Sequence, residues 1–149
     1  RGAGGFRLSP RNVPATGNRR WGGFGTDELA LSALPVHHGD VPALAWRAEI
    51  GDMRIVFAGD LGRVTTQLVE FARDADALIV HHSVPEGVRG DLADRHLAPG
   101  QIGRLASEAG VRMVILGHRM NRTRGRESLS TAAIEEHFKG PLIFAHDLE

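Results

Sequence analysis

The sequence contains no cysteine among its 149 residues, and this absence excludes two kinds of structure. A disulfide framework cannot form, and neither can a zinc site built on thiolates. The opening residues lack the pattern of a signal peptide, which together with the missing cysteines favours a reducing, cytoplasmic location. Any transition-metal site would have to use imidazole and carboxylate groups, and eight histidines are present to contribute to one.

Long apolar runs and an excess of one charge are also missing. No stretch is long and apolar enough to cross a membrane, so we expect no membrane partner. Lysine plus arginine equals aspartate plus glutamate at 18 each, so the net charge does not attract nucleic acid or anionic lipid. A local basic run at residues 119–126 reads most simply as a solvated loop. With 42% hydrophobic and 24% charged residues, the composition is that of one soluble globular domain.

Regular structure is expected from residue 29 onward. The preceding residues, 1–28, are rich in Gly, Arg, Pro and Asn and predict irregular, loop-rich or edge structure. Apolar runs then predict strands at 29–36, 43–50, 53–58, 77–80, 112–116 and 141–145. Helical periodicity and capping residues predict helices at 65–75, 98–110 and 128–138. The order is a β-hairpin region followed by βαβαβ, which is typical of an α/β fold.

Possible metal ligands stand where the strands end. "MRIVFAGD" ends in Asp60 and "MVILGH" ends in His118, each directly after a glycine that lets the backbone pass close to a bound group. His38, His81 and His82 follow other strands in the same way. Ligands in α/β sheets gather beyond the carboxyl ends of the strands, so these side chains are expected at one edge. A single strand-end histidine is more often a hydrogen-bonded surface residue, and only the repetition favours a metal site.

Four segments in order carry a family resemblance. They are "VHHGDVPALAWRAEIGDMRIVFAGDLG", "LVEFARDADALIVHHS", "HLAPGQIGRLASEAGVRMVILGH" and "GPLIFAHDLE". Together they resemble the C-terminal half of the metallo-β-lactamase fold, especially hydrolases of the ribonuclease Z-like branch. The resemblance implies that residues 29–149 form a partial domain, one half of a four-layer αββα sandwich. Such a half would hold a mixed sheet with its helices on one face.

The resemblance also implies a centre of two divalent metal ions, with zinc the expected metal. The family's ligands correspond residue by residue to His38, Asp60 and His118, and Asp60 would bridge the two ions. The ions would share a hydroxide that attacks a phosphodiester or other ester bond. His96 resembles a histidine that assists catalysis near the leaving group, although a structural hydrogen bond at the start of a helix is the alternative. The other strand-end histidines and Asp147 are expected to be supporting or packing residues.

One signature of that family is absent. The string H-x-H-x-D-H, which would supply most of the ligands, occurs nowhere in these residues. We therefore expect a partial protein whose own metal site is incomplete or weak, which is inactive alone and which binds either its missing N-terminal half or itself. A catalytically silent binding or assembly module of the same fold is the alternative. A small ester or phosphodiester is the expected substrate, because the neutral charge disfavours the further alternative, a transfer-RNA 3′-processing endonuclease.

Overall fold

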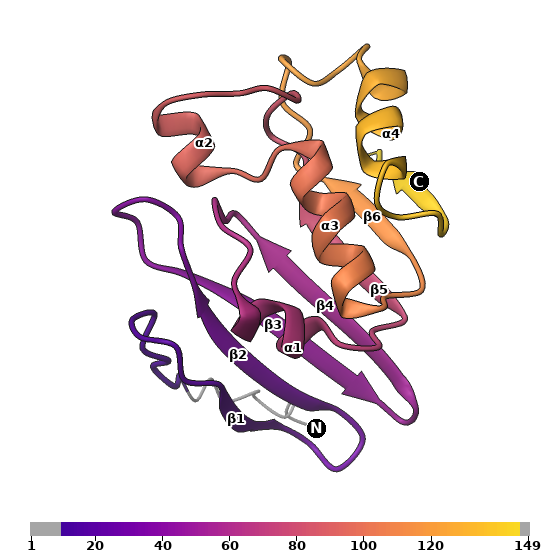
Figure 1. Ribbon diagram of the computed structural model, residues 1–149. Helices are drawn as coiled ribbons and strands as arrows, with labels where there is room; N and C mark the ends of the chain where they lie inside the picture. Colours follow the sequence, from indigo (N-terminus) through magenta and orange to yellow (C-terminus); the bar gives the residue numbers. More distant parts are fainter. Residues whose placement is uncertain (1–9, 147–149) are drawn as a thin grey trace, which may run out of the picture.

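Seven strands form one sheet in the computed structural model, which describes residues 10–146 (Figure 1). The strands are Trp21–Gly25 (β1), Ala30–Val36 (β2), Ala43–Ile50 (β3), Met53–Gly59 (β4), Ala77–His81 (β5), Val114–Gly117 (β6) and Leu142–Phe144 (β7). The helices are Thr66–Ala72 (α1), Asp91–Arg95 (α2), Pro99–Ala109 (α3) and Glu127–Glu135 (α4). The strands lie in sequence order, antiparallel from β1 to β4 and parallel from β4 to β7. This confirms the predicted α/β fold with a mixed sheet.

Two elements were not predicted as such. β1 is a short edge strand inside the segment expected to be irregular or edge structure, and its register with β2 shifts between Trp21 and Phe24. Its last residue, Gly25, has a φ of 112°, and an added Cβ would lie 1.8 Å from the carbonyl oxygen of Leu29. The other element, α2, buries none of its residues. A helix without a buried face has no apolar periodicity, so its sequence carries no helical signal.

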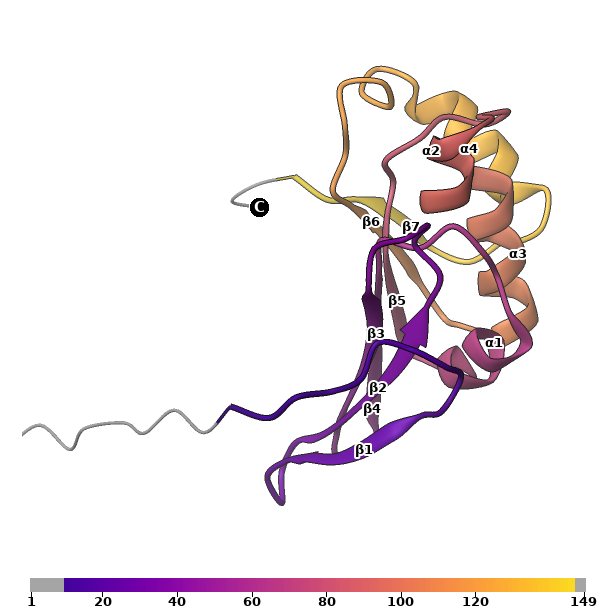
Figure 2. The ribbon, with the colours of Figure 1, turned by 90° about the vertical axis from the view of Figure 1, so that its left-hand side faces the viewer.

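All the helices lie on one face of the sheet (Figure 2). The parallel strands follow one another in space as they do in sequence, so right-handed crossovers place every connecting helix on the same side. Under these helices the sheet buries Val56, Leu78 and Val114 completely, each at 0% exposure. Among residues 10–146, no helix combines the length and the apolar character that a membrane span requires.

The opposite side of the sheet, which we call the open face, carries no helix of residues 10–146 (Figure 2). The strand register aligns one row of large apolar side chains across it, namely Trp46, Phe57, Ile79, Ile115 and Ile143. Phe57 is 43% exposed and Ile143 is 46% exposed. The sheet is therefore apolar on both faces, although the helices of residues 10–146 cover only one of them.

Candidate metal centre

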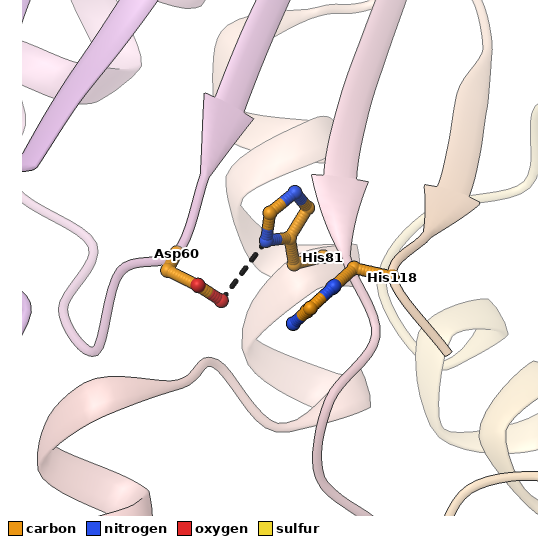
Figure 3. A group of neighbouring side chains, drawn as sticks. All are labelled: Asp60, His81 and His118. Carbon is orange, nitrogen blue, oxygen red and sulfur yellow. Dashed lines mark hydrogen bonds and ion pairs between the residues drawn. The ribbon is translucent and has the colours of Figure 1, made fainter. Parts of the chain in front are cut away.

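Three adjacent strands bring histidine and aspartate side chains to one edge of the sheet (Figure 3). Asp60 directly follows β4, His81 is the last residue of β5, and His118 directly follows β6. One ligand atom from each of these side chains lies within 4.8 Å of the other two. Two imidazoles and a carboxylate are a donor set that zinc and related divalent ions prefer, so the residues fit a metal ion.

Asp60 is the centre of this cluster. Its Oδ1 atom lies 2.9 Å from Nδ1 of His81 and 3.0 Å from Nδ1 of His96. The contact with His81 is a hydrogen bond, whereas the contact with His96 lacks hydrogen-bond alignment and leaves that buried nitrogen without a partner. Burial raises the pKa of Asp60, but the hydrogen bond from His81 and the charges of His81, His96 and His118 outweigh it and lower the pKa. Asp60 is therefore an ionised carboxylate, available as a ligand.

His38 and His96 form a second pair next to the cluster. Their ring centroids are 5.3 Å apart. Nδ1 of His38 lies 2.7 Å from the carbonyl oxygen of Arg95, which can only accept, so Nδ1 donates and Nε2 keeps a free lone pair. Burial lowers the pKa of His96 and outweighs the opposing charge of Asp60. The structure thus joins Asp60, His96 and His118 at one edge and places His38 beside His96, outside the three-residue cluster.

The sequence predicts that His81 supports the ligands or packs, and the structure places it between Asp60 and His118. The signal that could have found it is the order of the strands, because β5 lies between β4 and β6. Its neighbour His82 does pack: it is fully buried, and its Nε2 lies 2.9 Å from Oγ of Ser130. Burial and the nearby charge of Arg119 lower the pKa of His82 to about 4.

The loop that follows His118 holds this residue in an uncommon conformation. His118 has a φ of 49°, and a left-handed residue other than glycine costs roughly 1–3 kcal/mol. Thr123 anchors the loop by donating from Oγ1 to the carbonyl oxygen of His82 at 3.0 Å. The side chain of Arg119, expected in a solvated loop, is only 7% exposed, pairs with Glu127 and lies over the ring of Phe144. The interpretation of this segment as a solvated loop is therefore wrong for Arg119.

A polar cavity of about 850 Å³ opens beside the cluster. Its lining includes His118, Arg119, Arg124, Glu127 and His146. His146 is exposed, and its ring lies outside the three-residue cluster. The other residue that was predicted at this end of the chain, position 147, falls outside the described residues.

Known sequences identify the family. A family model described as "Beta-lactamase superfamily domain" matches residues 3–119. A ribonuclease Z from Kineococcus radiotolerans is 32% identical over 169 aligned positions, which cover 97% of this chain and 53% of that protein. A ribonuclease Z from Myxococcus xanthus is 34% identical over 96 positions, which cover 63% of this chain and 31% of that protein. The chain thus spans about half the length, or less, of the curated relatives it matches.

Solved structures share the fold. The metallo-β-lactamase fold protein YhfI from Bacillus subtilis has a TM-score of 0.72 at 22% identity, over 82% of this chain and 48% of that one. The short form of human tRNase Z has a TM-score of 0.64 at 18% identity, over 85% of this chain and 44% of that one. Since the family model covers most of the chain, the chain belongs to the metallo-β-lactamase superfamily, and its sequence is similar to that of ribonuclease Z proteins.

Proposed function

We propose that the protein to which this chain belongs is a metal-dependent hydrolase of phosphodiester or other ester bonds. The observation that carries the proposal is the convergence of Asp60 with His81, His96 and His118 at the carboxyl ends of the parallel strands. Divalent ions, with zinc favoured by the donor set, would supply Lewis acidity and an activated water there. The absence of cysteine suits a cytoplasmic enzyme of this kind.

The residues of this chain take separate roles in the proposal. His38, Asp60 and His118 would hold the divalent ions, with the ionised carboxylate of Asp60 as the anionic ligand. His96 is the proton-transfer residue near the leaving group. Its Nδ1 lies 3.0 Å from Oδ1 of Asp60, so Nε2 would be the nitrogen that faces the substrate.

The chain contributes one part of the active protein. We propose that residues 29–149 are the C-terminal half of the domain and that the rest of the protein covers the open face and adds ligands. The length of the relatives supports this, and so does the apolar row of the open face, in which Phe57 and Ile143 are exposed. Without that cover the chain would be inactive and would associate with itself through the same face.

RNA is a second candidate substrate. The names of the relatives favour it, since both are called ribonuclease Z and one structural neighbour is a tRNase Z. The equal numbers of acidic and basic residues argue against an RNA-gripping surface on this part of the protein. A catalytically silent binding or assembly module is the non-enzymatic alternative, because H-x-H-x-D-H is absent from these residues.

The test measures turnover and bound metal together on the complete protein, with bis(p-nitrophenyl) phosphate as the probe. We expect His96→Ala to lower kcat by about 100-fold or more and to leave the metal content unchanged. Exposed His137 provides the matched control, and His137→Ala should change neither quantity. Metal loss in His96→Ala would contradict the role given to His96. A metal-loaded wild type without turnover of ester or RNA probes would favour the silent module.

A further inference from the structure

We propose that His81 is a direct metal ligand, so that Asp60, His81 and His118 bind one divalent transition-metal ion without help from the rest of the protein. The inference rests on the proposed function, which makes this edge of the sheet a metal centre. It adds a ligand that the family resemblance does not include. It also gives this chain a metal affinity of its own.

The strand ladder places His81 between the two other ligands. β5 pairs with β4 and β6, and the register sets Val80 opposite Gly59 and His81 opposite Gly117. Asp60 and His118 each come one residue after those paired glycines. Side chains alternate along a strand, so His81 shares the open face with Ile79 and points away from the helices. Its position is therefore set by the ladders on both sides of β5.

The contacts of His81 suit a cation shared by three groups. Its Nδ1 lies 2.9 Å from Oδ1 of Asp60, and its ring centroid lies 4.5 Å from that of His118, with the rings tilted by 35°. Figure 3 shows the three side chains converging from adjacent strand ends. A proton between Asp60 and His81 satisfies only those two groups. A metal ion would satisfy all three, whose ligand atoms lie within 4.8 Å of one another.

A packing role does not account for His81. Its side chain is 32% exposed, and among residues 10–146 it forms a hydrogen bond with Asp60 alone. Adjacent His82 shows what a packing histidine looks like here, since it is fully buried and bonded to Ser130. The competing role is that His81 only orients Asp60 from behind, as second partners of metal ligands do. Direct ligation and orientation differ in whether a His81 nitrogen binds the ion.

Nitrogen NMR separates these two roles. The full chain is labelled with 15N-histidine and titrated with Zn²⁺ while the ring resonances are followed. We expect one ring nitrogen of His81 and one of His118 to shift together and to reach saturation at one zinc per chain. The exposed His137 should stay unchanged. In competition with a chelator, His81→Ala should weaken zinc binding more than about 100-fold, beyond the 10- to 100-fold typical of an orienting partner.

The outcomes distinguish the inference from the proposed function. If the His118 nitrogen shifts and neither nitrogen of His81 does, His81 is no ligand, and the proposed function stands. If no histidine shifts and no zinc is retained by the chain or by the complete protein, both are overturned. The wild-type titration decides the question even if His81→Ala fails to fold, since side-chain to backbone correlations assign the ring resonances without variants.

Discussion

The two faces of the sheet are built from the same strands, and yet they have opposite surroundings. On the covered face, Val56, Leu78 and Val114 are completely buried beneath the helices. On the open face, Phe57 and Ile143 are almost half exposed although their side chains are as apolar. Strands of this kind gain most when both faces are covered. The comparison shows that the sheet is apolar enough to be covered on both faces, whereas the helices of residues 10–146 cover only one of them.

The same contrast appears in two consecutive histidines. His82 points toward the helices, where it is fully buried and bonded to Ser130. His81 points to the other face, where its ring meets Asp60 and His118 at the sheet edge. A shift of one residue along a strand therefore separates a packing histidine from one placed to bind a ligand.

The largest effect on stability is expected when an apolar side chain of the covered face is truncated to alanine, compared with the same truncation on the open face. Leu78→Ala should lower the free energy of unfolding by about 2–5 kcal/mol, because it leaves a cavity under the helices. The adjacent Ile79→Ala, on the open face, should cost about 1 kcal/mol or less. Urea denaturation at low protein concentration measures both. Equal losses would show that the open face is already covered in this chain.

A smaller loss of stability is expected at acid pH, and its source is the buried His82 on the covered face. The pKa of His82 is about 4 in the folded chain against 6.5 for a free histidine, so between these values the unfolded chain binds the extra proton. Stability should therefore be full above pH 6.5 and should fall by at most about 3 kcal/mol as the pH drops toward 4. Unfolding of His82→Gln and of wild type across this window provides the check. The same slope in both proteins would contradict the assignment to His82.

A charged substitution on the open face is expected to have the smallest effect on stability. Its effect on the association of the chain with itself should be clear. Phe57→Lys should change the free energy of unfolding by only about 0.5 kcal/mol, because almost half of the side chain is already exposed to water. It should nevertheless shift the isolated chain toward monomer, because it puts a charge in the apolar row. Size-exclusion chromatography with light scattering measures this. A wild-type chain that is monomeric at every concentration would rule out self-association through this face.

The predicted features are those with a local physical cause. Apolar runs between turn residues predicted six of the seven strands, and the glycine before Asp60 and before His118 indicated where ligands could stand. β1 could not be predicted as a strand, because it is a glycine-rich edge strand whose register with β2 shifts. α2 was invisible because it buries no residue.

The place of His81 depends on a non-local property. Sequence alone shows that it ends a strand, and it does not show which strands flank that strand. Once β5 is known to lie between β4 and β6, the convergence with Asp60 and His118 follows from the register. The buried state of Arg119 is missed for a similar reason, since its partner Glu127 and the aromatic ring of Phe144 come from other elements.

Metal analysis of the dialysed chain tests the central claim, that the edge where β4, β5 and β6 end is a metal centre organised by Asp60. Wild type, Asp60→Ala and the control His137→Ala would be loaded with zinc, dialysed and compared by elemental analysis. We expect wild type and His137→Ala to retain zinc equally and Asp60→Ala to retain none. Equal zinc in wild type and Asp60→Ala would contradict it.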